Sequence, residues 1–223
     1  MVEKTRNGLF VTFEGGEGSG KTTQVRLLAN RLRAETIEVV ETRDPGGTAI
    51  GKEIRDLLIG RESVSMADAS ELLLYEASRA QLVREVIRPA IDRGAVVLSD
   101  RFTDSTIAYQ GFGRGLDLDL IRGLNQFVTG GLKPDLTVLL DLDPILGLER
   151  CTKSVRVERS FRDRIAAEPL AFHQRVKEGY LALARQESER IRLIDARLSL
   201  SEIEAAVWRE FMRVKGSRLI VHG

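Results

Sequence analysis

The chain has 223 residues, of which 43% are hydrophobic, and this predicts one globular domain with one good core. Basic and acidic residues number 34 and 33, so the overall charge provides no field that would draw the protein onto nucleic acid or an anionic membrane. Cys151 is the single cysteine, and no apolar run approaches the roughly 18 residues of a membrane span. We therefore expect a cytoplasmic protein with no nucleic-acid or membrane partner.

Short β-branched runs alternate with longer helical patterns along the chain. The runs predicted as strands are Gly8–Glu14, Ile37–Arg43, Ala95–Ser99, Leu136–Leu140 and Ile191–Ile194. Apolar spacings of three and four predict helices over Lys21–Ala34, Thr48–Ile59 and Asp68–Ile91, and further helical stretches separate the later strands. Nearly continuous apolar strands that alternate with helices indicate a three-layer α/β fold, with a five-stranded parallel sheet between two layers of helices.

Two segments stand apart from this pattern. The stretch Thr152–Arg164 is rich in arginine and poor in core-forming residues, and we expect a mobile basic lid over about residues 151–164. The tail at residues 216–223 contains a short apolar run. It could add an edge strand, cover an apolar patch or be disordered.

Residues 15–22 read GGEGSGKT and match G-x-x-x-x-G-K-[ST], the phosphate-binding loop, between a predicted strand and a predicted helix. Glycines let backbone N–H groups surround a phosphate, and the start of the helix adds a positive end. Lys21 can reach the outer phosphates, and the Thr22 hydroxyl can hold Mg²⁺. The residues expected to bind ATP are Gly15, Gly16, Glu17, Gly18, Ser19, Gly20, Lys21, Thr22 and Thr23. The motif predicts a P-loop NTPase fold, but it does not choose between a motor, a switch and a kinase.

Two further polar stretches follow predicted strands, TRDPGGT at residues 42–48 and DRFTDST at residues 100–106. Open α/β sheets bind their ligands at the carboxyl ends of the strands, so both stretches should border the same crevice as the phosphate loop. Each holds an arginine beside a carboxylate, which suits a second phosphate group bound opposite the first. An ion pair that ties two loops together is the alternative. The chain lacks the Asn-Lys-x-Asp motif of a guanine-nucleotide switch.

Taken in order, these motifs resemble those of bacterial thymidylate kinases, P-loop nucleoside monophosphate kinases. The resemblance covers nearly the whole chain: FEGGEGSGKTTQ, TRDPGGTAIGKEIRDLLI, ELLLYEASRAQLVREVIRPAI, DRFTDSTIAYQGFGRG, PDLTVLLDLDP, DRIAAEPLAFHQRVKEGYLALA and IRLIDARLSLSEI. It implies transfer of the γ-phosphate of ATP to dTMP, giving dTDP and ADP for dTTP synthesis. It also implies Mg²⁺ as a cofactor and a homodimer.

The same resemblance implies an acceptor site. Glu17 would hold the 3′-hydroxyl of dTMP, Tyr75 would stack on thymine, and Arg79 would bond a thymine carbonyl. Tyr109 would crowd C2′ and so disfavour ribonucleotides, because a 2′-hydroxyl would lose water without gaining a partner. The other acceptor residues it implies are Asp44, Thr106 and Gln110, with Arg43, Arg55 and Arg101 around the monophosphate. For both tyrosines, plain core packing is the alternative.

Catalysis should depend on positioning and neutralisation, because a dianionic phosphate monoester can attack the ATP γ-phosphorus without a strong base. The residues expected to act are Lys21, Arg43, Asp100, Arg101 and Arg164, with Thr22 and Asp100 (through water) at the metal. Since the phosphate loop holds no arginine, the resemblance implies that a lid arginine reaches the transferred phosphoryl. Arg164 matches that position best, and Arg156, Arg159 and Arg162 are further candidates unless they belong to a solvated charged loop.

Three functions remain open from the sequence. The first is a dTMP kinase, and the second is a kinase for another nucleoside or nucleotide. The third is a regulator that uses ATP occupancy as a signal and transfers nothing. The third is disfavoured because such a regulator has no need for a deoxyribose pocket.

Overall fold

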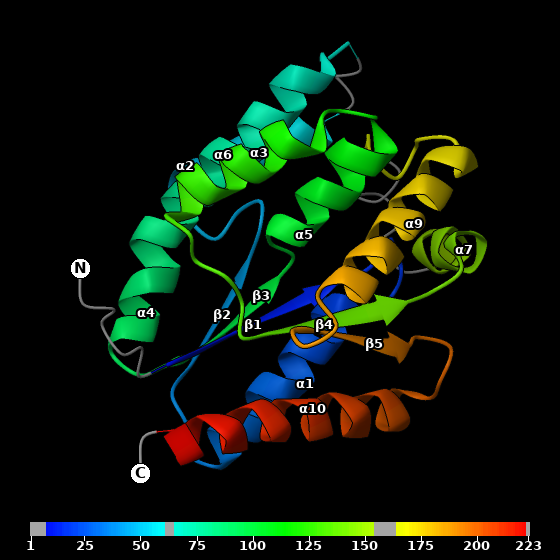
Figure 1. Cartoon of the computed structure of the whole chain (residues 1–223). Coiled ribbons are helices and arrows are strands. Elements are labelled where there is room, and N and C mark those ends of the chain that lie inside the picture. The colour runs from blue at the N-terminus through cyan, green and yellow to red at the C-terminus, as the bar shows by residue number, and fades with distance from the viewer. Residues whose placement is uncertain (1–7, 61–64, 154–163, 222–223) are drawn as a thin grey trace.

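A single parallel sheet forms the centre of the protein (Figure 1). The structure is a computed structural model that describes residues 8–60, 65–153 and 164–221, with 217–221 as backbone alone. The five strands are β1 (Leu9–Glu14), β2 (Val39–Arg43), β3 (Val96–Asp100), β4 (Leu136–Asp141) and β5 (Ile191–Asp195). They lie in the order β2-β3-β1-β4-β5, and all neighbouring pairs are parallel, as predicted.

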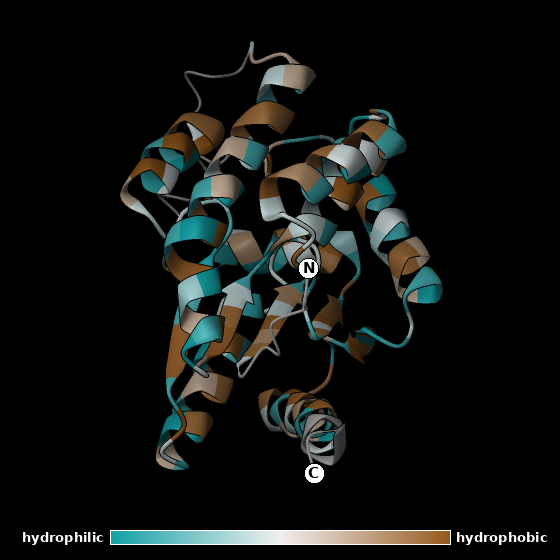
Figure 2. Ribbon diagram, turned by 60° about the vertical axis from the view of Figure 1, so that its left-hand side comes forward, coloured by the Kyte–Doolittle hydropathy of each residue, from teal (hydrophilic) through white to brown (hydrophobic). Residues whose placement is uncertain are grey.

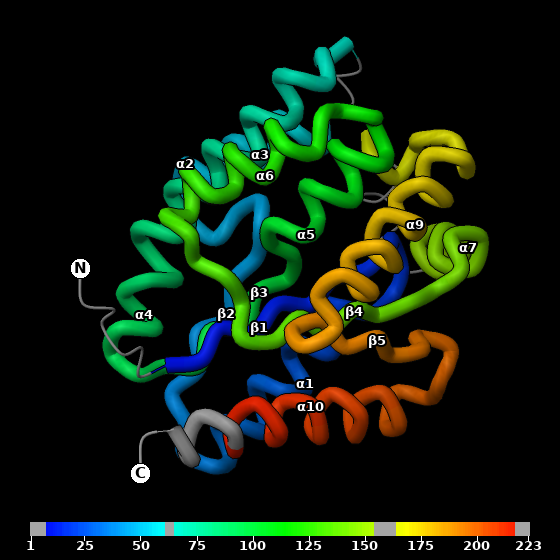
Figure 3. The backbone as a smooth tube through the Cα atoms, viewed as in Figure 1, coloured from blue at the N-terminus to red at the C-terminus, as the bar shows by residue number. Residues whose placement is uncertain are grey.

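Helices cover both faces of this sheet and make the three layers expected from the sequence. The segments are α1 (Lys21–Ala34), α2 (Ala49–Ile59), α3 (Asp68–Leu82), η2 (Val83–Ile87), α4 (Arg88–Asp92), α5 (Thr103–Thr106), η3 (Ile107–Gly113), α6 (Leu118–Thr129), α7 (Pro144–Lys153), α9 (Leu170–Gln186) and α10 (Leu200–Val221). Figures 1 and 3 show α1 and α10 side by side on one face, and α4, α5 and α9 on the other.

Strand alternation divides the core between the two faces. Val11 and Phe13 of β1 pack with α1 and α10, whereas Phe10, directly before Val11, packs against the opposite layer. The inner strands β1, β3 and β4 are almost wholly buried, and the edge strand β2 is partly exposed. In Figure 2 the central strands are accordingly the most continuous hydrophobic part of the fold. Burial on both faces explains their near-continuous apolar sequences.

Polar caps fix several helix ends. The Thr48 hydroxyl accepts a hydrogen bond from the backbone N–H of Gly51 at the start of α2 (Oγ1–N 2.9 Å), and Asp117 caps α6 in the same way through Leu120 (Oδ1–N 2.7 Å). Gly130 ends α6 in the left-handed conformation, with φ 56°. These caps set where the loops beside the sheet begin.

Two parts of the fold differ from the expected pattern. The helix predicted over Asp68–Ile91 is built from α3, the π-helical turn η2 and α4, with Pro89 in the first turn of α4, where its missing N–H is tolerated. The backbone of the tail continues α10 to Val221, so residues 216–221 are helical and form no edge strand. Among the described residues, no helix is long and apolar enough to cross a membrane.

Candidate active site

The phosphate loop follows β1 directly and leads into α1, the context that the motif requires. Gly18 has φ 66°, and a Cβ at this position would collide with the backbone carbonyl of Gly147. Gly20 precedes the helix with φ 94°. Both conformations favour glycine, so the glycine pattern in the sequence reflects the backbone path of the loop.

Lys21 closes over the phosphate loop. Its Nζ donates hydrogen bonds to the carbonyl oxygens of Gly15 (3.1 Å) and Gly16 (2.8 Å), and to the Ser19 hydroxyl (3.3 Å). Burial, followed by the charge of Arg101, lowers the pKa of the ammonium. The cation is thus already aligned along the loop, with carbonyl partners that phosphate oxygens can replace.

Thr22 and Asp100 meet at the start of α1. The Thr22 hydroxyl donates to Asp100 Oδ2 over 2.6 Å, which joins the phosphate loop to the end of β3. Both side chains offer oxygen, the ligand type that Mg²⁺ prefers, and Mg²⁺ commonly takes only one or two protein ligands beside substrate phosphates. No cluster of three or more His, Cys, Asp or Glu side chains suited to a metal occurs within residues 8–60, 65–153 and 164–221. The pair therefore fits a phosphate-bound Mg²⁺ better than a metal held by the protein alone.

A cleft of about 560 Å³ runs from the phosphate loop towards α3. Residues from six separate parts of the chain line it: Glu17, Asp44, Arg55, Tyr75, Arg79, Arg101, Thr106, Tyr109 and Gln110, together with Pro45, Ile59, Ser105 and Ile165. The first nine are acceptor residues expected from the sequence, and the structure gathers them in one continuous space. Arg43, also expected to hold the acceptor phosphate, is not among the lining residues.

Arg101 dominates the end of the cleft nearest the phosphate loop. Its Nη2 donates to Glu17 Oε1 (2.7 Å) and to the Tyr109 hydroxyl (3.0 Å), and its Nη1 donates to the carbonyl of Gly15 (3.0 Å). Its backbone has φ 73°, an unusual conformation for a residue with a Cβ. Such conformations cluster at functional sites because the surroundings must hold them in place.

Glu17 is the anion of this end of the cleft. Besides the Arg101 contact, its Oε1 accepts a hydrogen bond from the Tyr109 hydroxyl over 2.8 Å. Burial alone would raise the pKa of Glu17, but Arg101, Lys21 and the Tyr109 hydrogen bond outweigh it and lower the pKa to about 2. Glu17 is therefore a carboxylate at any physiological pH, and its oxygens are able to accept hydrogen bonds from a ligand hydroxyl.

Arg79 lies at the opposite end of the cleft and is fully buried, with 1% of its side chain exposed. Its Nε donates to Asp44 Oδ2 (2.5 Å) and its Nη1 to Glu76 Oε1 (2.8 Å). The remaining donors reach Asn125 Oδ1, Thr106 Oγ1 and the Phe102 carbonyl. All five N–H groups thus have protein partners. The Asp44 carboxylate is thus engaged with Arg79.

Two of the predicted catalytic arginines lie elsewhere. Arg43, at the end of β2, is exposed, and its side chain lies against Gly46 outside the cleft lining. The Arg164 guanidinium donates to Glu71 and to the Leu58 carbonyl (Nε–O 3.3 Å), and its described contacts include no phosphate-loop residue. Arg164 is thus held by α2 and α3, and the sequence motif did not predict these contacts. Arg156, Arg159 and Arg162 lie outside the described residues.

Several side chains that support the cleft were not anticipated. Glu71 is buried and accepts hydrogen bonds from Gln110 (Oε1–Nε2 2.7 Å), Arg114 and Arg164. Ser105 and Tyr180 donate to Glu14 beneath Arg101. Ser105 could have been found, because it lies four residues after Arg101 in the same motif. The others come from distant segments that no local pattern connects.

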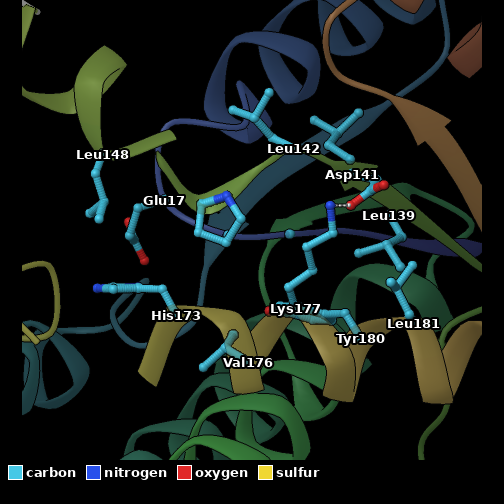
Figure 4. Close-up of a pocket in the computed structure, with 14 residues that line it drawn as sticks. Glu17, Leu139, Asp141, Leu142, Leu148, His173, Val176, Lys177, Tyr180 and Leu181 are labelled. Atoms are coloured by element: carbon cyan, nitrogen blue, oxygen red, sulfur yellow. Dashed lines mark ion pairs between the residues drawn. The ribbon is translucent and has the colours of Figure 1, made fainter. Parts of the chain in front are cut away.

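A second hollow lies on the other side of Glu17, between the phosphate loop, the end of β4, α7 and α9 (Figure 4). Its walls are mainly leucine side chains, with an ion pair between Lys177 Nζ and Asp141 Oδ1 (3.0 Å) at one side. His173 faces it beside Glu17, and burial lowers the pKa of this imidazole. This histidine forms part of the wall behind the phosphate loop.

Comparisons with known proteins converge on one family. A family model described as thymidylate kinase matches residues 13–207. The chain is 51% identical to thymidylate kinase of Deinococcus radiodurans over 90% of this chain and 95% of the relative, and 54% identical to that of Gloeobacter violaceus over 86% and 89%. A crystal structure of thymidylate kinase from Ehrlichia chaffeensis superposes with a TM-score of 0.73 and 33% identity, covering 92% of this chain and 98% of the other.

Proposed function

Because the chain belongs to the thymidylate kinase family and phosphorylates dTMP to dTDP with ATP, we propose that the cleft between Glu17 and Arg79 is its dTMP site. The phosphate loop then binds ATP, and the acceptor phosphate meets the donor at Arg101. One observation carries this assignment: nine of the ten acceptor residues expected from the sequence line a single cleft that begins at the phosphate loop. Family membership favours this activity over the two alternatives considered above.

The two phosphates would meet between Lys21 and Arg101. The partly exposed Arg101 can exchange protein partners for two oxygens of the dTMP phosphate, as a planar guanidinium does in bidentate pairing. Lys21 and the loop amides hold the donor phosphates. In-line alignment and neutralisation then supply most of the rate enhancement, because phosphoryl transfer needs little covalent help from the protein.

Selection of the deoxynucleotide would take place at Glu17 and Tyr109. Glu17 is ionised and can accept the 3′-hydroxyl hydrogen, while the buried Tyr109 ring limits the space beside C2′. Tyr109 also packs edge to face with Phe172, with ring centroids 6.1 Å apart, so it serves the core and the site together. At the far end, the fixed Arg79 cluster and Tyr75 would form the walls around thymine.

Mg²⁺ would be held by Thr22 and Asp100 together with the ATP phosphates, where it would supply positive charge to the transferred group. The protein keeps Thr22 Oγ1 and Asp100 Oδ2 side by side, where the phosphate loop meets the end of β3. The proposed reaction feeds dTTP synthesis, and we expect it in the cytoplasm, where both nucleotides are present.

We further propose a homodimer formed through α2, α3 and α6, which lie side by side in Figure 1. Large hydrophobic side chains are exposed on all three helices: Ile50, Leu57, Leu73, Leu120 and Phe127. Phe127 alone is 83% exposed. Scattered exposed leucines are ordinary, but five on adjoining helices are typical of an interface. Light scattering should give twice the monomer mass for the native chain and a lower mass for Phe127→Ser.

An ADP-release assay with dTMP, dUMP, UMP and CMP as acceptors tests the site. We expect dTMP to be preferred and the two ribonucleotides to be poor acceptors. Crystals grown with dTMP and an ATP analogue should show the deoxynucleotide among Glu17, Tyr75, Arg79 and Arg101. Its absence from that cleft in a chain that turns over dTMP would refute the assignment of these residues.

A further inference from the structure

Glu14, the last residue of β1, is a buried carboxylate that the mechanism above leaves without a role. Its side chain is 1% exposed. Oε1 accepts a hydrogen bond from the backbone N–H of Phe102 (2.8 Å), and Oε2 accepts from the hydroxyls of Ser105 (2.6 Å) and Tyr180 (2.8 Å). All three partners are neutral, and no side chain in the described ranges forms a salt bridge with Glu14. A buried carboxylate held only by neutral donors is unusual, because burial normally demands a cation.

The same two hydroxyls also hold Arg101. Its Nη1 donates to Ser105 Oγ (3.2 Å) and to the Tyr180 hydroxyl (3.1 Å), and the two hydroxyl oxygens are 2.8 Å apart. Carboxylate, hydroxyls and guanidinium therefore form one closed network built from β1, α5, α9 and the loop after β3. Glu14 lies one hydrogen-bonded step behind the group proposed to bind the acceptor phosphate.

The charged and titratable groups around Glu14 are Arg101, Lys21, Arg79, Asp104 and Tyr180. Burial, followed by the negative charge of Asp104, raises the pKa of Glu14 to about 7, against the opposing effects of Arg101 and the two hydroxyls. Asp104 is itself paired with Arg190 over 2.8 Å. A further negative charge near Arg101 would raise the pKa of Glu14 again.

We propose that Glu14 positions Arg101 through Ser105 and Tyr180, and that it takes up one proton from solvent when the acceptor phosphate binds to Arg101. This inference rests on the proposed dTMP site. The dianionic phosphate adds negative charge beside Arg101, and this charge favours the protonated form of Glu14. Protonated Glu14 then donates to one of the two hydroxyl oxygens, each of which can donate and accept, so the network survives the change.

Calorimetry of dTMP binding without ATP tests the proton uptake. Titrations at pH 8 in buffers of different ionisation enthalpy give the number of protons taken up, and dTMP is already dianionic at that pH because its second pKa is about 6. We expect an uptake approaching one proton for the native chain. Glu14→Gln keeps the shape and can still donate and accept, so it should bind dTMP with no uptake. Equal uptake by the native chain and Glu14→Gln would overturn the proposal.

The positioning role has a separate readout. Ser105→Ala and Tyr180→Phe each remove one hydroxyl that links Glu14 to Arg101, and each should raise KM for dTMP about tenfold while leaving KM for ATP unchanged. In both variants the number of protons taken up on dTMP binding should also be lower than in the native chain. Unchanged KM for dTMP in both would contradict the role, and it would do so even if Glu14→Gln failed to fold. Failure of the native chain to bind dTMP would instead refute the proposed site itself.

Discussion

The two ends of the acceptor cleft are each built around an arginine, but the two arginines are held differently. Arg79 is 1% exposed and pairs with Asp44 and Glu76, which are equally buried. Arg101 is 15% exposed and pairs with Glu17, which is 22% exposed. A fully buried, saturated arginine forms a fixed wall, whereas a partly exposed one can exchange partners with a ligand. Arg79 should therefore contribute most to the stability of the fold, and Arg101 should contribute most to ligand binding.

The largest effect is expected from Arg79→Met, which leaves Asp44 and Glu76 buried without their cation. We expect a loss of about 3–5 kcal/mol in the free energy of unfolding, measured by urea denaturation. Adding Glu76→Gln should restore part of the loss, because one buried charge is then removed. If Arg79→Met alone were as stable as the native chain, Arg79 would not be the residue that stabilises this end of the cleft.

Arg101→Ala should behave in the opposite way. Loss of a group that neutralises the transferred phosphoryl is expected to lower kcat/KM for dTMP by about 10²–10³-fold. Stability should fall by much less than in Arg79→Met, because the Glu17 carboxylate can gain water. Arg122→Ala, which removes an exposed arginine on α6, is the matched control. If Arg101→Ala bound dTMP normally, the phosphate end would have to be reassigned.

Tyr109→Phe probes the hydroxyl alone, because the ring and its packing remain. The variant loses the hydrogen bonds to Glu17 and Arg101, so we expect about a tenfold rise in KM for dTMP. Discrimination between dUMP and UMP should be preserved, since the ring is proposed to exclude the 2′-hydroxyl. Steady-state kinetics with both nucleotides separates the two roles, and a loss of discrimination would assign it to the hydroxyl.

The smallest effect is expected from the pH dependence of Glu17. Its pKa is lowered from 4.5 to about 2 in the folded chain, so its stabilising contribution is complete above about pH 4.5 and is lost as pH falls towards 2. We expect about 1 kcal/mol, because solvent screens this pair. Comparing unfolding of the native chain and Glu17→Gln between pH 6 and pH 3 gives the value. If the native chain's advantage in the free energy of unfolding over Glu17→Gln increased from pH 6 to pH 3, the predicted stabilisation by ionised Glu17 would be contradicted.

How far the sequence predicted the molecule depends on the range of the interaction. The phosphate loop is a local motif, and strand ends bring separate motifs to one edge of the sheet, so the acceptor residues could be assembled without coordinates. The partners of those residues could not. Glu14 meets Ser105 across 91 positions and Tyr180 across 166, and hydrophobic periodicity carries no information about such pairs. For Arg164, the matching motif likewise did not reveal its contact with Glu71.

The π-helical turn η3, which carries Tyr109 and Gln110, has a consequence for changes in chain length. Such a turn is wider than an α-helical one and holds an additional residue. Deletion of Ala108 should let ordinary α-helical bonds take over, so the helix would persist. Because the residue removed is the additional one, the chain beyond the turn would keep its orientation. The side chains just after the deletion, Tyr109 and Gln110 among them, would be rotated by about 100°. Loss of one codon in this stretch would therefore turn cleft-lining side chains away from the cleft, although Tyr109 and Gln110 are still present in the chain.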